Sequence, residues 1–196
     1  MRRVLVGATA LVLGAAGPPP ADPDWPCVQR LVPTLTAGTL WSGHEAAGDW
    51  RADPQVVVAV SDAAPRTQPV SKAVARLEAY AATIPAADRP AALSLLFTGL
   101  VDETNRQRTD VIERLRGIGR RQRTLTEITG RVSDELRALP PDAPAAAREE
   151  VVQRRAFLIR EYEEIGRTIR YACEVPSALE ARLGSFAQAL QHDLTQ

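Results

Sequence analysis

The chain has 196 residues, of which 24 are Lys or Arg and 24 are Asp or Glu, so its formal net charge is zero. Nucleic-acid-binding proteins usually carry a basic excess, and the balance therefore argues against that class. Aromatic residues make up 5% of the chain, which leaves few bulky side chains for a wide globular core and favours helices packed through Leu, Val, Ile and Ala.

The N-terminus has the layout of a secretory signal peptide, which we place at residues 1–21. Two arginines precede an apolar stretch, Val4–Ala16, and small residues and prolines follow it. As a helix this stretch spans about 20 Å, too short for a hydrocarbon core of about 30 Å, although an uncleaved anchor is the alternative. Cleavage after Ala16 or after Ala21 fits the pattern. We therefore expect a periplasmic or secreted protein.

Residues 22–67 are rich in Pro, Gly and turn-forming residues, and we expect an irregular N-terminal arm with one short helix. The chain has only two cysteines, Cys27 in this arm and Cys173. Because disulfides persist in exported proteins, we expect the intramolecular Cys27–Cys173 bond; two free thiols or an intermolecular link are the alternatives. Such a bond would close most of the chain into one loop, worth roughly 5 kcal/mol in the chain-entropy model.

The arm also holds all three tryptophans, Trp25, Trp41 and Trp50, which are candidates for a surface that binds a partner. The alternative is that they anchor the arm onto the rest of the protein. Near them, His44 and neighbouring carboxylates hint at a metal site, but such a site needs three or four ligands and the chain has two histidines. Ser42 lacks any nucleophile motif. We therefore predict neither metal, cofactor nor enzymatic activity.

Two helices are expected before the chain becomes regular. Asp53 followed by Pro54 is a helix start, and the next residues, "VVVAV", form a helix or a strand for which the chain offers no partner strand. A second helix is predicted over residues 68–84, where apolar residues recur on one side.

Two long helices follow, over residues 90–139 and 143–194, separated by the stretch "ALPPDAPA". In both, apolar residues recur at alternating steps of four and three, the pattern of a coiled-coil seam. Asp142 is expected to cap the second long helix, and Pro176 to kink it by removing a backbone donor. The short turn predicts that the two helices fold back antiparallel, with Phe97 opposite Phe186 and Val132 opposite Val151.

Several polar features of these helices have a structural and a functional interpretation. In this register the Arg-rich stretch 114–123 faces Glu161, Glu163 and Glu164, so ion pairs explain it better than a nucleic acid does. Gly117, Gly119 and Gly166 lie at one level and indicate close packing or a hinge. Polar residues at seam positions would specify the register or a partner helix; they are Arg108, Gln122, Thr129 and Arg155.

We therefore predict an all-α protein, a long antiparallel helical hairpin resembling a coiled coil (residues 68–196) with a small helical or irregular N-terminal cap. The helix of residues 68–84 is expected to pack against the hairpin and form a three-helix end. The function that fits is an exported scaffold or adaptor that binds an envelope protein partner. The alternative is a periplasmic stress chaperone or sensor, against which the single methionine argues. The sequence leaves the oligomeric state open.

Overall fold

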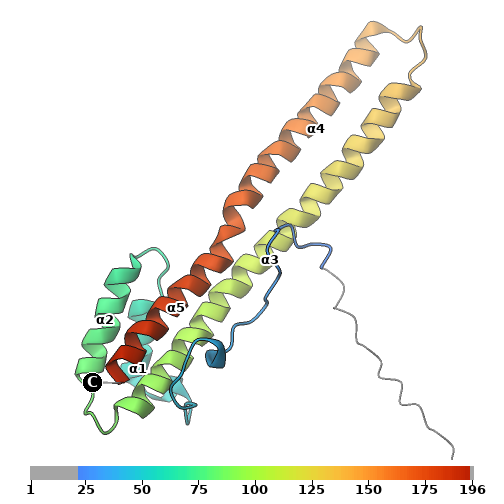
Figure 1. The fold of residues 1–196 in the computed structure, drawn as a ribbon. Coiled ribbons are helices and arrows are strands. Elements are labelled where there is room, and N and C mark those ends of the chain that lie inside the picture. The colour runs from blue at the N-terminus through green and yellow to red at the C-terminus, as the bar shows by residue number, and fades with distance from the viewer. Residues whose placement is uncertain (1–21, 195–196) are drawn as a thin grey trace, which may run out of the picture.

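The computed structural model describes residues 22–194, so the signal peptide predicted over residues 1–21 lies outside the described residues. Within them the chain contains helices and no strand, which confirms the all-α class. The long helix α3, Arg89–Ala138, is the spine of the molecule. Helices α4, Ala145–Ala172, and α5, Glu174–Leu194, run back along it, and together the three form an elongated rod (Figure 1).

The first helix, α1, spans Pro54–Ala63 and begins as the sequence predicts. The carboxylate of Asp53 accepts hydrogen bonds from the backbone N–H groups of Gln55, at 2.9 Å, and Val56, at 3.3 Å. These bonds satisfy two of the donors that a helix leaves free at its N-terminus. The "VVVAV" stretch is therefore helical.

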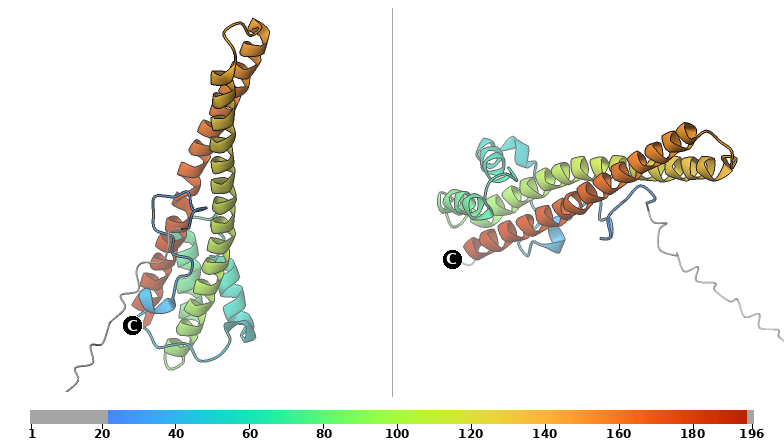
Figure 2. Two further views of the ribbon diagram at one scale, coloured as in Figure 1. Left: turned by 90° about the vertical axis from the view of Figure 1, so that its right-hand side faces the viewer. Right: turned by 90° about the horizontal axis from the view of Figure 1, so that it is seen from above.

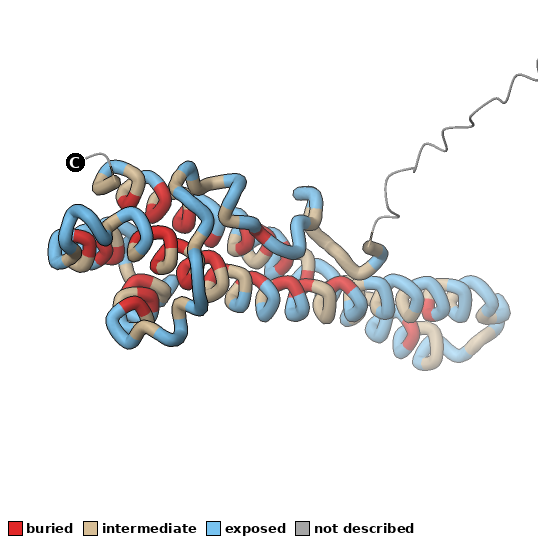
Figure 3. Tube along the Cα trace, turned by 90° about the horizontal axis from the view of Figure 1, so that it is seen from below, coloured by how far each residue is buried: buried red, intermediate tan, exposed pale blue. Residues whose placement is uncertain are grey.

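One end of the rod, which we call the proximal end, is a four-helix bundle. Helix α2, Val70–Ala82, packs mainly on α5, and α1 packs on both α3 and α2. This corrects the expected three-helix end, because the short α1 also covers α3. Their apolar faces share one core (Figures 2 and 3); its fully buried members include Val56, Leu77, Leu93, Leu96, Phe97, Leu100, Leu183, Phe186 and Leu190.

The second long helix predicted over residues 143–194 is in fact two helices. The break falls at Cys173, between α4 and α5. Pro176 lies three residues further on, and its missing N–H would have bonded the carbonyl group of Ala172, the last residue of α4. The predicted kink is thus present. It takes the form of a break between α4 and α5, immediately after the carbonyl group that lacks a hydrogen-bond donor because of Pro176.

The start of α4 differs from the prediction as well. Asp142 does not cap this helix; α4 begins at Ala145 with Pro144 at the N-cap position, and no side chain bonds its first N–H groups. Two prolines before Asp142 and one after it favour a longer turn. The helix therefore starts two residues later than predicted, and the carboxylate of Asp142 does not cap it.

The buried Arg182 binds backbone carbonyl groups where the chain leaves α1. Arg182 of α5, 7% exposed, donates from Nη2 to the carbonyl oxygen of Ala63, at 2.9 Å, and from Nη1 to that of Gln68, also at 2.9 Å. These carbonyls belong to the end of α1 and the loop before α2. Arg182 therefore fastens that loop to α5.

Gly99 of α3 lies where α1 and Trp50 approach the spine most closely. A methyl group there would come within 2.7 Å of the Val60 side chain and 2.9 Å of the Trp50 ring. We expect Gly99→Ala to lower the free energy of unfolding, since overpacking costs about 1–3 kcal/mol and the helix gains only about 1 kcal/mol in propensity.

Gly130 is the matched control, because nothing lies within 4 Å of a methyl group placed there. Gly130→Ala should raise the free energy of unfolding by up to about 1 kcal/mol. Urea titrations followed by circular dichroism measure both changes. Equal stabilisation by the two substitutions would contradict the close approach at Gly99.

Candidate functional site

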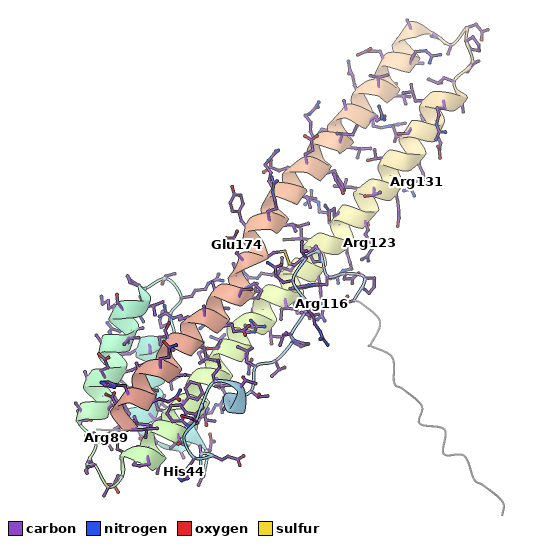
Figure 4. The ribbon with its side chains drawn as sticks, viewed as in Figure 1. His44, Arg89, Arg116, Arg123, Arg131 and Glu174 are labelled. Atoms are coloured by element: carbon purple, nitrogen blue, oxygen red, sulfur yellow. A yellow bond between two sulfur atoms is a disulfide. The ribbon has the colours of Figure 1, made fainter. Side chains whose placement is uncertain are left out.

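The first part of the predicted N-terminal segment, residues 22–35, which alone we call the arm from here on, lies across the middle of the rod (Figures 1 and 4). A disulfide joins its Cys27 to Cys173, at the break between α4 and α5, with the two Cα atoms 5.6 Å apart. This confirms the predicted pairing. The arm therefore bridges α3 and the α4–α5 break at one level of the rod.

Two carboxylates of the arm pair with arginines of α3. Asp22 Oδ2 lies 2.8 Å from Nε of Arg116, and Asp24 Oδ2 lies 3.0 Å from Nη1 of Arg120. Asp24 also pairs with Arg123 through its other oxygen. Three of the five ion pairs that the structure shows for the Arg-rich stretch are therefore made with the arm.

The predicted partners on α4 account for a smaller part of the pairing. Arg121 lies 3.1 Å from Glu161, as the expected register implies. Glu164, however, pairs with Arg167 of its own helix. We did not predict the arm as a partner of this stretch, although its two aspartates precede Cys27 by five and three residues and the predicted disulfide would have carried them to this level.

Gly119 makes this arrangement sterically allowed. A Cβ atom on Gly119 would overlap the backbone carbonyl oxygen of Asp24. The close approach that we predicted for the three glycines therefore exists, but it is between α3 and the arm. A methyl group placed on Gly117 would have its nearest neighbour at 3.8 Å, and one placed on Gly166 would have none within 4 Å. The hinge interpretation of Gly117, Gly119 and Gly166 stays a prediction; α3 is helical throughout.

We call Arg116, Gly119, Arg120 and Arg123 the cradle. The pKa of both aspartates is lowered, that of Asp24 mainly by the cradle and that of Asp22 by the arm backbone and the cradle together. For Asp22 the main cause is the hydrogen bond from the backbone N–H of Asp24, followed by the bond from Arg116. For Asp24 the main cause is the bond from Arg123, followed by that from Arg120. Both side chains therefore favour the charged form that the arginines bind.

Beside the cradle, the arm covers a small apolar cluster in the seam. Leu115 of α3 packs with Ile165, Ile169 and Cys173, and Trp25 lies against this group. The indole N–H of Trp25 donates to the carbonyl oxygen of Gln29 at 2.7 Å, within the arm. Trp25 thus adds apolar contact to the ionic contacts of the cradle.

The arm has a second anchor, nearer the proximal bundle. The side chain of Asn105 bonds both backbone groups of Leu35, at 2.8 Å and 2.9 Å. Arg108, 3% exposed, donates to the carbonyl oxygen of Val32 at 2.7 Å and to that of Pro176 at 2.5 Å. Arg108 therefore joins the arm to α5 just past the α4–α5 break, a structural use of this predicted polar seam residue.

Two of the three tryptophans, Trp41 and Trp50, pack against the proximal core, and Trp25 packs against the cluster beside the disulfide. Trp41 stacks on Phe97, with ring centroids 4.8 Å apart. The indole N–H of Trp50 donates to Asp102 at 2.9 Å. All three indoles therefore pack against the helices, which fits the anchoring interpretation; their use as a surface that binds a partner stays a prediction.

Little metal-binding or nucleophile chemistry gathers around His44. This residue is exposed, and its carbonyl oxygen accepts a hydrogen bond from the Trp41 indole. Ser42 donates to Gln191. Among residues 22–194 no group of three or more His, Cys, Asp or Glu side chains could hold a metal ion.

Beyond the arm the rod continues as two helices, which we call the distal hairpin, residues 124–166. Figure 3 shows that burial falls sharply there. Val132 and Val151 are its buried pair near the tip. Within the described part of the chain, no other helix packs against this segment.

Ion pairs join the two helices within the distal hairpin, Arg154 with Glu135, and just outside it, Arg121 with Glu161. The distal hairpin also has a shallow groove of about 220 Å³. We call it the open groove; its lining is Thr126, Thr129, Ile159 and Tyr162. Tyr162 is 42% exposed, so an aromatic ring stands at the edge of an uncovered apolar groove.

No helix among the described residues is long and apolar enough to span a bilayer. In comparisons with known proteins, no family model matches the chain, and no curated protein or solved structure is significantly similar to it.

We expect docking of the arm on the cradle to depend on pH, because Asp22 and Asp24 bind the arginines in their charged form. Because the folded-state pKa values of Asp22 and Asp24 are lowered, their contribution is complete above the unfolded value of about 3.9 and is lost as the pH falls through the folded values. Carboxyl NMR titrations should give midpoints below about 3.9 for both. Arg123→Gln should raise the Asp24 midpoint; an unchanged midpoint would mean that this ion pair does not form.

Replacing Arg108 tests the second anchor. Arg108→Met keeps the length of the side chain but leaves the carbonyls of Val32 and Pro176 without this donor, which should cost about 1–3 kcal/mol in unfolding free energy. Arg106→Met is the control, because Arg106 is 65% exposed and pairs only at the surface, so its effect should stay within about 0.5 kcal/mol. Similar losses in urea titrations of both variants would rule out the anchoring role.

Proposed function

We propose that the chain is exported and serves as a helical scaffold or adaptor, which binds a protein partner of the cell envelope through its distal hairpin. Export is supported by the arrangement of residues 1–21 in the sequence and by the Cys27–Cys173 disulfide, which suits an oxidising compartment. The observation that carries the binding role is the open groove, an apolar strip on a two-helix segment with no covering element among the described residues.

The proximal bundle indicates what kind of partner would fit. There the same two-helix arrangement of α3 with α5 is completed by α1, which covers α3, and by α2, which packs on α5, and the four helices share one apolar core. A partner helix lying along the open groove would complete the distal hairpin in the same manner. Its apolar face would meet Ile159 and Tyr162, and the short side chains of Thr126 and Thr129 permit a close approach.

A chaperone for unfolded proteins is the alternative. Such surfaces often use flexible methionine side chains, and the chain has one methionine, at position 1. The open groove is also small, with four lining residues, which suits one defined partner better than many unfolded ones.

The test is capture from periplasmic extract by the tagged full-length protein after chemical cross-linking. We expect one envelope protein at a constant ratio to the bait. Tyr162→Arg should abolish this capture, because it places a charge at the groove. Tyr171→Arg should retain it, since Tyr171 lies on the same helix, is 76% exposed and is outside the groove.

Two results would contradict the proposal. Capture of the same partner by wild type and Tyr162→Arg would remove the open groove from the binding role. A broad mixture of unrelated unfolded proteins would favour the chaperone. Circular dichroism of each variant checks that it remains helical.

A further inference from the structure

The cradle holds the arm as a peptide-binding site holds its ligand. Two carboxylates, Asp22 and Asp24, meet three guanidinium groups of one helix. Arg123 also donates to the backbone carbonyl of Pro23, and Trp25 fills the apolar cluster alongside. Side-chain charge, backbone and an aromatic ring are thus all contacted within four consecutive residues.

Gly119 leaves room on α3 for the backbone of a crossing peptide chain. Glycine within a helix is less favourable than alanine, and here its bare surface is filled by the carbonyl group of Asp24. Gly130 of the same helix has open space around it. The close approach of a crossing chain is therefore a property of Gly119 and is not shared by every glycine of α3.

The arm contacts the cradle through non-covalent interactions, which can break and form again. The side chains of Arg120 and Arg123 are 54% and 47% exposed, and exposed ion pairs each contribute little to stability. Just beyond the disulfide, Val28 is fully exposed, so the arm lifts off the rod there. The covalent bond of Cys27 to Cys173 keeps the first residues of the arm beside the cradle at a high effective concentration.

We propose that the cradle is a binding site for an acidic peptide segment of a protein partner, and that the arm occupies it in cis while Cys27 and Cys173 are joined. The segment carries two carboxylates two residues apart, followed by an aromatic residue, as in the arm. This site lies apart from the open groove, so the inference goes beyond the proposed function.

The exchange requires opening of the disulfide. A dithiol reductant supplies two electrons and two protons: the bond between the two sulfur atoms breaks, Cys27 and Cys173 become thiols, and the reductant becomes a disulfide. The anchor at Asn105 and Arg108 lies further along the chain. The released residues therefore stay tethered to the rod while the cradle becomes accessible.

The experiment measures binding of a fluorescent peptide of residues 22–32, made with serine at position 27, by anisotropy. The protein is the full chain with its own arm weakened; its substitutions are Asp22→Asn, Asp24→Asn, Cys27→Ser and Cys173→Ser. We expect saturable binding that weakens as salt is added. Asparagine at both peptide aspartates should weaken it at least about tenfold, and oxidised wild type should bind at least about tenfold more weakly than the variant.

Gly119→Ala and Gly130→Ala in the same background are the matched pair. The first should abolish binding, because its methyl group occupies the position of the peptide carbonyl, and the second should retain it. Wild type reduced with a phosphine repeats the titration without substitutions. Absence of binding to both arm-released forms, binding that ignores the peptide carboxylates, or equal binding by the two glycine variants would overturn the proposal.

Discussion

The disulfide between Cys27 and Cys173 fixes the arm at the middle of the 50-residue helix α3, and the two halves of the molecule differ on either side of it. On the proximal side four helices share a core; on the distal side two helices run alone. The bond spans 146 residues, for which the chain-entropy model gives a stabilisation of roughly 5 kcal/mol. The bond also lies at the α4–α5 break, where the helix is interrupted near Pro176, and it joins this break to the arm.

Buried arginine side chains bind backbone carbonyl groups in two parts of the molecule. Arg182 takes up carbonyl groups after α1, and Arg108 takes up those of Val32 and Pro176 near the break. A buried carbonyl without a donor is costly, and a guanidinium group with five N–H donors can serve several at once. Burial lowers the pKa of both arginines, yet an arginine retains its charge in a protein. At least these two arginines of the chain therefore have a structural role.

Patterns confined to one helix were predictable from the sequence. Asp53 and Pro54 start α1, and the seam placed α3 within one residue of its observed ends. The disulfide followed from having two cysteines, and the effect of Pro176 from its missing donor. Features that depend on packing partners were not predictable: periodicity says nothing of the helix covering the back of α3, so the proximal bundle has one helix more than expected.

The candidate site shows the same limit. Nothing in the stretch 114–123 says which carboxylates it meets, because Asp22 and Asp24 reach it only through the path of the arm. The glycine of interest, Gly119, was recognisable as a place of close approach, but its neighbour proved to be the arm and not α4. The sequence did not show that Trp41 and Trp50 pack on the proximal core while Trp25 packs beside the disulfide.

Hydrogen exchange of the full-length protein, oxidised and reduced, tests most directly whether the arm divides the rod. We expect slow exchange in α3 residues 93–112, which lie in or next to the proximal core, and fast exchange in the distal hairpin. Reduction should speed exchange at residues 115–123 and 165–173 and leave the proximal bundle unchanged. Uniform protection along α3, or no change on reduction, would contradict the claim that the disulfide-bound arm sets the boundary.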